Sequence, residues 1–226
     1  MKILLTGGSG RLGGELKKII KCDAPLKSEF DILYSPTDIL LEYDLVVHCA
    51  AYTSVEDAEI DRAVAYRINV EGTKRISDAG VPILYISTEH VFDGEKGNYK
   101  ECDIPNPANY YALTKLLGEF TLNDKSKIIR TSFKERPFVY PKAFVDQWTS
   151  GDYADVIAKE IKIVIDNFDK LPRIMNVGTS KKSIYELAKQ SREVEPVSRL
   201  DNLKTKSPKD TSLNLDSWNR FKKGVI

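Results

Sequence analysis

The sequence has few cysteines, few histidines and no long hydrophobic run. Its three cysteines, Cys22, Cys49 and Cys102, are widely spaced and form no Cys-x-x-Cys pair, which argues against a disulfide framework and favours a reducing compartment. One of the two histidines, His48, has no second ligand nearby, so we expect no metal site. No run is long enough to span a membrane, and the N-terminal apolar run enters a glycine turn too soon for a signal peptide. We therefore expect a cytoplasmic protein.

The chain also lacks a charge bias. Its 226 residues include 34 Lys and Arg against 33 Asp and Glu, which gives a formal net charge of +1. This balance provides no attraction to nucleic acid or to an anionic membrane, and we expect neither as a partner. The length allows one substantial core with a small appended lobe.

What the sequence does contain is a glycine-rich turn near its N-terminus. An apolar run at residues 2–6 predicts a buried strand, the turn occupies residues 7–14, and residues 12–20 have the apolar spacing of a helix. Strand, turn and helix in this order are the context of a dinucleotide-binding fingerprint, in which glycines let the backbone approach a pyrophosphate at the helix N-terminus. Two registers fit: Gly7, Gly10 and Gly13, or Gly8, Gly10 and Gly13.

The segment that follows leaves the cofactor open. Residues 21–35 offer no clear second strand. An acidic residue about 20 positions after the glycines indicates NAD, whereas a basic one indicates NADP. Asp23, Lys27, Glu29 and Asp31 all lie near that distance. We therefore expect NADP(H) or NAD(H).

Strand-like and helical patterns alternate along the rest of the chain. Strands are expected at residues 44–51, 81–86, 127–133 and 173–177, and helices at residues 64–79, 111–119, 153–168 and 183–190. The alternation predicts an α/β fold with a Rossmann-type, doubly wound parallel sheet, which binds ligands at the carboxyl ends of its strands. The glycine turn, residues 50–52 and Thr88 all fall at such ends. Ser183 and Glu186 form a capping-box pattern, and residues 134–143 look like an irregular loop.

Three residues form a candidate catalytic group. Tyr111 and Lys115 are four positions apart on the expected helix and so share one face. A free tyrosine, with a pKa of about 10, protonates a carbonyl oxygen reluctantly near neutral pH, and a nearby ammonium lowers that pKa. Thr88, at the end of a strand, is placed to hydrogen-bond the same substrate oxygen. A Tyr-x-x-x-Lys pattern alone is a weak signal, and the other motifs strengthen it.

Together these patterns resemble the extended short-chain dehydrogenase/reductases and, within them, the dTDP-4-dehydrorhamnose reductases. The resemblance rests on residues 6–13, 50–59, 69–73, 87–94, 111–119 and 130–132, with a shortened remnant at 146–158. It implies an NAD(P)-binding Rossmann domain at residues 1–133. Residues 134–226 would then form a small, abbreviated C-terminal substrate-side lobe with segments that pack back on the Rossmann core. The oligomeric state stays open, and a homodimer is the assembly to consider.

The resemblance also implies a reaction. Tyr111 would donate the proton, Lys115 would assist it and bind the cofactor ribose, and Thr88 would polarise the keto oxygen. The nicotinamide would deliver hydride to C4 of a nucleotide-linked 4-keto-6-deoxyhexose, as in the conversion of dTDP-4-dehydrorhamnose to dTDP-rhamnose. The implied cofactor-binding residues are Gly7, Gly10, Arg11, Leu12, Gly13, Asp31, Ile32, Ala50, Ala51, Tyr52, Ser87, Tyr111 and Lys115. The implied substrate-binding residues are Val55, Thr88, Glu89 and Phe133.

The chain departs from the family pattern on the substrate side. Glu89 and His90 stand where the family has an aspartate and a tyrosine, and Phe133 replaces a tryptophan expected to stack on the substrate. The identities of the sugar and the nucleotide base therefore stay open. Two other hypotheses compete. One is a non-catalytic, cofactor-binding regulatory subunit similar to the beta subunit of methionine adenosyltransferase. The other is a nucleotide-sugar epimerase or dehydratase, which would need Glu89 as an extra acid or base.

Overall fold

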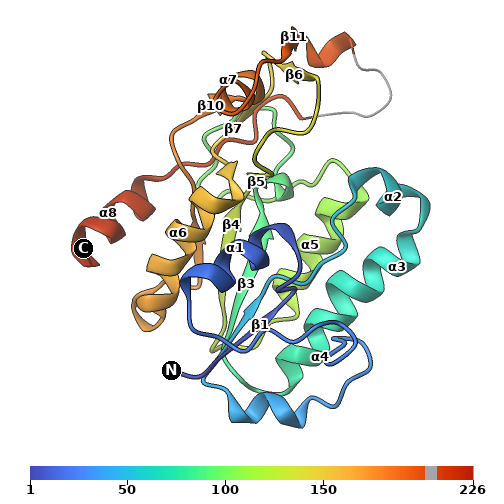
Figure 1. Cartoon of the computed structure of the whole chain (residues 1–226), viewed down its shortest axis with the longest axis vertical. Helices are drawn as coiled ribbons and strands as arrows, with labels where there is room; N and C mark the ends of the chain where they lie inside the picture. The colour runs from blue at the N-terminus through green and yellow to red at the C-terminus, as the bar shows by residue number, and fades with distance from the viewer. Residues whose placement is uncertain (202–207, 226) are drawn as a thin grey trace.

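The computed structural model describes residues 1–201 and 208–225, and its centre is one parallel sheet (Figure 1). The five strands follow the order β1-β2-β3-β4-β9, and all neighbours are parallel. Their bounds are β1 Ile3–Thr6, β2 Leu45–His48, β3 Ile83–Thr88, β4 Lys127–Thr131 and β9 Ile174–Asn176. Every residue of the first three strands is buried, as expected for a sheet that is covered on both faces.

Helices cover both faces of this sheet, which confirms the predicted Rossmann-type α/β fold (Figure 1). On one face, α1 (Arg11–Ile19) and α6 (Ala154–Asp166) pack with β1 and β3 in the main apolar core. The other face is covered by α2 Val55–Ile60, α3 Arg62–Tyr66, the π-helix η2 Arg67–Gly72, α4 Thr73–Asp78 and α5 Tyr110–Phe120. Short 3-10 helices are η1 Asp38–Glu42, η3 Glu89–Val91, η4 Phe168–Lys170 and η5 Arg199–Asp201.

Within residues 21–35, Asp23 alone pairs with β1. The Asp23 N–H donates to the Ile3 carbonyl oxygen at 2.9 Å, and the Leu5 N–H donates to the Asp23 carbonyl oxygen at 2.8 Å. The neighbouring residues form turns rather than a strand, as the absence of a clear strand pattern in residues 21–35 predicted. On the free side of β1, the sheet is therefore extended only by the single-residue bridge at Asp23.

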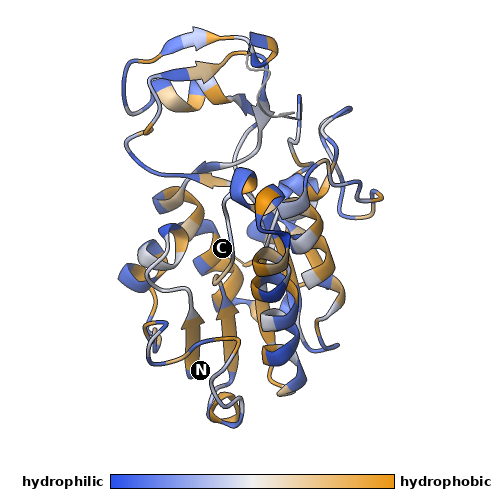
Figure 2. Cartoon of the chain, turned by 90° about the vertical axis from the view of Figure 1, so that its right-hand side faces the viewer, coloured by the Kyte–Doolittle hydropathy of each residue, from blue (hydrophilic) through white to orange (hydrophobic). Residues whose placement is uncertain are grey.

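A small lobe lies above the carboxyl ends of the sheet strands (Figures 1 and 2). Its elements are β5 Phe133–Lys134, β6 Lys142–Phe144, β7 Trp148–Thr149, β8 Asp152–Tyr153, β10 Lys182–Ser183, α7 Ile184–Lys189 and β11 Glu195–Val197. Phe138, Ala143 and Leu187 belong to its own apolar cluster. The segment 134–143, expected to be irregular, begins and ends in short strands that pair with β8 and β11.

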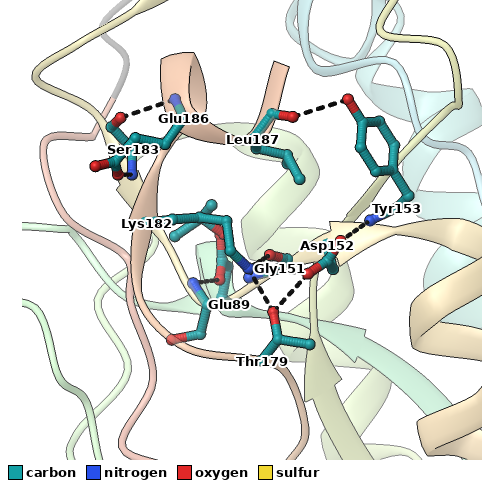
Figure 3. A network of polar contacts seen from close by, with 11 residues as sticks. Glu89, Gly151, Asp152, Tyr153, Thr179, Lys182, Ser183, Glu186 and Leu187 are labelled. Atoms are coloured by element: carbon teal, nitrogen blue, oxygen red, sulfur yellow. Dashed lines mark hydrogen bonds and ion pairs between the residues drawn. The ribbon is translucent and has the colours of Figure 1, made fainter. Parts of the chain in front are cut away.

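Hydrogen bonds fix the ends of α7 (Figure 3). Ser183 caps the helix, and the side chains of Ser183 and Glu186 form the predicted capping box. The Tyr153 hydroxyl donates to the Leu187 carbonyl oxygen at 2.9 Å. Nearby, the Lys182 ammonium donates to Asp152 Oδ2 at 2.9 Å, which ties β10 to β8.

The C-terminal helix α8 (Asp216–Val225) returns to the Rossmann part of the chain. Its Trp218 is fully buried in the main core, and the indole N–H donates to Glu160 Oε2 of α6 at 2.8 Å. Residues 202–207 and 226 of the expected substrate-side region lie outside the described residues. Among the described helices, none combines the length and the apolar character that crossing a membrane requires.

Candidate active site

A cavity of about 500 Å³ opens at the carboxyl ends of β1 to β4. Its wall brings together most of the predicted site residues, although they come from distant parts of the chain. These are Gly7, Gly10, Arg11, Leu12, Gly13, Asp31, Ile32, Ala50, Ala51, Val55, Ser87, Thr88, Tyr111 and Phe133. Three predicted residues, Tyr52, Glu89 and Lys115, do not line it. The convergence places the candidate cofactor and substrate residues around one space.

The glycine turn forms one end of the cavity wall. Gly7 has a φ of +72°, and a Cβ atom there would lie 2.5 Å from the Ala50 nitrogen. A Cβ at Gly13 would lie 2.2 Å from the Gly7 carbonyl oxygen. Gly8 faces Ala24 instead and does not line the cavity. The register Gly7, Gly10 and Gly13 is therefore the one that faces the cavity. Side chains at Gly7 and Gly13 would clash with backbone atoms of Ala50 and of the turn itself.

The helix that follows the turn points its N-terminus at the cavity. α1 begins at Arg11 after the extended residue Gly10, and no side chain caps it. Gly10 to Gly13 line the cavity, so the unpaired N–H groups and the positive dipole end of the helix face it. This arrangement fits the diphosphate of a dinucleotide.

An acidic and a basic side chain lie together at the end of the cavity away from Thr88 and Tyr111. Asp31 and Lys27 both line it, with 3.8 Å between Lys27 Nζ and Asp31 Oδ2. The other Asp31 oxygen accepts from the Leu33 N–H at 2.8 Å. A carboxylate suits a ribose 2′-hydroxyl and an ammonium suits a 2′-phosphate. The geometry at this end thus accommodates both types of cofactor.

Thr88 and Tyr111 form the polar centre of the cavity. Thr88 ends β3, and Tyr111 lies in the first turn of α5, which the Asn109 side chain caps by accepting from the Ala112 N–H at 2.9 Å. Burial raises the pKa of Tyr111 to about 12, and a hydrogen bond with the Thr88 side chain opposes this rise. At neutral pH Tyr111 is therefore a protonated phenol beside a second hydroxyl.

Lys115 lies one turn further along α5 but not in the cavity wall. It is buried, and its ammonium stands over the Tyr85 ring, 4.0 Å from the ring centroid. Burial lowers the pKa of Lys115 to about 7, against the opposing effect of the Glu119 carboxylate. In this structure the amine stands over the Tyr85 ring, and the pKa of Tyr111 is raised by burial. That Lys115 lowers the pKa of Tyr111 stays a prediction.

A buried ion pair that the sequence analysis missed supports the cavity floor. Glu119 Oε1 accepts from the Ser87 hydroxyl at 2.5 Å and from Arg130 Nε at 3.1 Å, and Glu119 Oε2 accepts from Arg130 Nη2 at 2.8 Å. Glu119 follows Tyr111 by eight positions and Lys115 by four, so the three share a helix face. A carboxylate on that face was the signal that could have revealed the pair.

His48 anchors the ends of β1 and β2 below the cavity. Its Nδ1 lies 2.7 Å from the Thr6 hydroxyl, and its Nε2 lies 3.1 Å from the Thr73 hydroxyl. Since Thr73 donates to the Asn69 carbonyl oxygen, it accepts from Nε2, and Nδ1 accepts from Thr6. Burial lowers the pKa of His48 to about 3. This histidine is therefore a neutral structural group in one tautomer.

Glu89 and Tyr52 are held away from the cavity. Glu89 is 1% exposed, and its carboxylate accepts from the Thr149 and Thr211 hydroxyls at 2.6 and 2.9 Å. Burial raises the pKa of Glu89 to about 7. The Tyr52 backbone N–H donates to Asn69 Oδ1, and the Tyr52 carbonyl oxygen accepts from Asn69 Nδ2. Glu89 thus joins the core to the small lobe, while the next residue, His90, lines the cavity.

The fold and this cavity define a protein of the extended short-chain dehydrogenase/reductase type. Residues 1–163 match the family model described as RmlD substrate binding domain. The chain belongs to this family.

Individual relatives agree with this assignment. The chain is 34% identical over 189 residues to a dTDP-4-dehydrorhamnose reductase from Aggregatibacter actinomycetemcomitans, a match over 75% of this chain and only 59% of the relative. A hypothetical dTDP-4-dehydrorhamnose reductase from Sulfolobus tokodaii has a TM-score of 0.84 at 34% identity, covering 97% of this chain and 94% of that chain. The dTDP-4-dehydrorhamnose reductase from Bacillus anthracis, solved in complex with NADP, has a TM-score of 0.86 at 25% identity, covering 100% and 94%.

Proposed function

We propose that this protein reduces the C4 keto group of a nucleotide-linked 4-keto-6-deoxyhexose with NAD(P)H, as in the conversion of dTDP-4-dehydrorhamnose to dTDP-rhamnose. The observation that carries the proposal is the pair of hydroxyls, Thr88 and Tyr111, in a cavity that also contains a glycine cradle for a dinucleotide. The names of the relatives support the same reaction. The NADP complex of the Bacillus anthracis relative supports the cofactor.

Each residue then has a defined task. When bound, the nicotinamide supplies the hydride. The Thr88 hydroxyl donates a hydrogen bond to the keto oxygen and holds it beside the Tyr111 phenol, which donates the proton as the alkoxide develops. The protonated state of Tyr111 at neutral pH suits this role. Lys115, one helical turn away, would bind the cofactor ribose and assist the phenol after its amine turns from the Tyr85 ring toward the cavity.

The proposal is tested by replacing Tyr111 with phenylalanine. The purified protein should oxidise NADPH or NADH in the presence of dTDP-4-dehydrorhamnose, and Tyr111→Phe should lower kcat by roughly 10²–10⁴-fold because the general acid is lost. Tyr110→Phe is the matched control, since Tyr110 precedes Tyr111 and does not line the cavity. Equal rates for wild type and Tyr111→Phe would refute the role. Cofactor binding without any turnover would favour a regulatory subunit instead.

The position of Glu89 bears on the epimerase and dehydratase alternative. That chemistry needs an additional acid or base beside the substrate, and Glu89 was the candidate. Its carboxylate is engaged by Thr149 and Thr211 and does not line the cavity. The geometry therefore favours a single reduction over a reversible oxidation and reduction cycle.

We further propose that the protein is a cytoplasmic homodimer. Leu113 and Phe120 are exposed on one face of α5, seven positions apart, and the adjacent helix α2 exposes Ile60. Cys22, Cys49 and Cys102 are all free thiols, which suits the reducing cytoplasm. Sedimentation equilibrium should give twice the chain mass for the wild type and a larger monomer fraction for Phe120→Ser. A monomeric wild type would refute the dimer.

A further inference from the structure

Tyr85 contacts Lys115 in two places, once through its ring and once through its hydroxyl. The Lys115 ammonium stands over the ring, 4.0 Å from the centroid, and the Tyr85 hydroxyl donates to the Lys115 carbonyl oxygen at 3.2 Å. Tyr85 is a fully buried residue of β3, whereas Lys115 belongs to α5. A single side chain of the sheet therefore contacts both the amine and the backbone of the residue that is expected to bind the cofactor ribose.

The position of the Tyr85 side chain is fixed by its neighbours. α5 has a glycine, Gly118, where the phenol meets the helix, and a Cβ atom there would lie 2.4 Å from the Tyr85 hydroxyl oxygen. The ring also lies beside the imidazole of His48, with 5.7 Å between the two centroids. Close packing of this kind leaves the ring little freedom to move. The ring therefore presents a fixed aromatic face to the Lys115 amine.

This aromatic face is the closest partner of the amine. Among the described residues, the Lys115 ammonium makes no hydrogen bond and no ion pair. The Glu119 carboxylate raises the pKa of Lys115 from one turn further along α5, but its oxygens are bound by Ser87 and Arg130. An ammonium that is withdrawn from water is attracted to the face of an aromatic ring. The contact therefore holds the amine away from the cavity, which Lys115 does not line.

The ring and a cofactor ribose compete for one ammonium. We propose that Tyr85 is a positioning residue whose ring weakens the binding of NAD(P)H by holding the Lys115 amine away from the cavity. The inference rests on the role of Lys115 as ribose ligand in the proposed function. Ribose hydroxyls can accept from the amine only when it leaves the ring, so the apparent affinity falls with the fraction of molecules in which the amine stays there. Weaker binding favours exchange of the oxidised cofactor after each turnover.

The charge of Lys115 makes this competition depend on pH. Burial lowers the pKa of Lys115 to about 7. The titratable groups that interact with the amine are Tyr85, Glu119, His48 and Cys49. Burial lowers the pKa of His48 to about 3 and raises that of Cys49 to about 12 and that of Tyr85 above its ordinary value, while Glu119 belongs to the buried ion pair. Because a neutral amine is not attracted to the ring, the effect of Tyr85 should be present below about pH 7 and lost well above it.

The test is a fluorescence titration with NADPH or, if it binds more tightly, NADH. Tyr85→Leu lacks the ring, and the matched control Tyr85→Phe keeps it. At about pH 6, Tyr85→Leu should bind the cofactor about tenfold or more tightly than the wild type, whereas at about pH 9 the two should bind equally. Tyr85→Phe should follow the wild type at both pH values. A folded Tyr85→Leu with unchanged or lower affinity at about pH 6 would overturn the inference, as would an equal gain at both pH values.

Thermal melting checks that each variant is folded. If Tyr85→Leu does not fold, Tyr85→Met takes its place, because methionine also lacks a ring and adapts its shape to fill irregular gaps. Lys115→Met supplies the second arm of a double-mutant cycle, and on that background Tyr85→Leu should leave the cofactor affinity unchanged. A gain that persists without the amine would contradict the competition. So would a Lys115→Met protein that binds the cofactor as tightly as the wild type.

None of these measurements needs turnover of a sugar. A gain of affinity in Tyr85→Leu that depends on Lys115 and on pH supports the role of Tyr85 even if the wild type reduces no nucleotide sugar, an outcome that sinks only the proposed reaction. Conversely, an active reductase in which Tyr85→Leu brings no gain sinks only the role of Tyr85.

Discussion

Replacing Glu119 with glutamine should destabilise the protein severely, because this carboxylate neutralises a buried guanidinium. Glu119 and Arg130 are 5% and 3% exposed, and their charged groups meet through two hydrogen bonds of 2.8 and 3.1 Å. Glutamine keeps the size but replaces one oxygen with an NH₂ group. If this is Oε1, the NH₂ group faces two donors, the Ser87 hydroxyl and Arg130 Nε. Removing one partner of a buried ion pair costs about 3–5 kcal/mol.

That cost is large compared with the whole stability of a typical domain, about 5–15 kcal/mol. At about 2–4 °C per kcal/mol for a chain of this size, the melting temperature should fall by about 6–20 °C. The assay is urea unfolding followed by circular dichroism. Asp78→Asn is the matched control, since it alters an exposed pair with Lys74 and should cost at most about 0.5 kcal/mol. A loss below about 1 kcal/mol for Glu119→Gln would refute the reasoning, because the pair would then not be desolvated.

Three further predictions follow from buried or strained positions. Glu89→Gln should gain stability relative to the wild type by about 2–4 kcal/mol as pH rises from 4.5 to 7. The unfolded carboxyl ionises near 4.5 while burial keeps the native carboxyl protonated until about 7, so the wild type loses stability across this window; urea unfolding across this range checks the sign. Gly7→Ala should lose NADPH binding in a fluorescence titration, since a Cβ would lie 2.5 Å from the Ala50 nitrogen. A thiol reagent should label the exposed Cys102 in mildly alkaline buffer, whereas Cys49, whose pKa burial raises to about 12, should react only after unfolding.

Local patterns predicted much of the fold and of the cavity. The glycine turn follows directly on a buried strand, and Thr88 ends another, so the carboxyl-end rule for parallel sheets was enough to bring both to one edge. Tyr111 and Lys115 share a helix face at a spacing that any helix produces. However, the direction in which each side chain points depends on its neighbours in the folded structure. The ring of Tyr85, 26 positions before Tyr111, lies under the Lys115 ammonium, and no local pattern contains that contact.

The residues that sequence reasoning missed depend on contacts between distant segments. Glu119 meets Arg130 only because α5 packs beside β4, and His48 meets Thr73 only because η2 and α4 lie over β2. The orientation of Glu89 depends on Thr149 and Thr211, which come from the small lobe and from the segment before α8. Sequence spacing cannot supply such pairings, since each one requires the folded positions of two elements.

Four consecutive residues at the junction of β3 and η3 show how closely these roles are combined. Ser87 binds the buried Glu119, Thr88 meets Tyr111 in the cavity, Glu89 binds the small lobe, and His90 returns to the cavity wall. Because β3 ends at Thr88 and η3 begins at Glu89, a shift by one position would move the cavity hydroxyl and the buried carboxylate out of their places together. This short segment at the junction of β3 and η3 therefore contributes to the buried ion pair, the carbonyl site and the contact with the lobe together. An insertion or deletion at this point should therefore disturb all of these contacts at once.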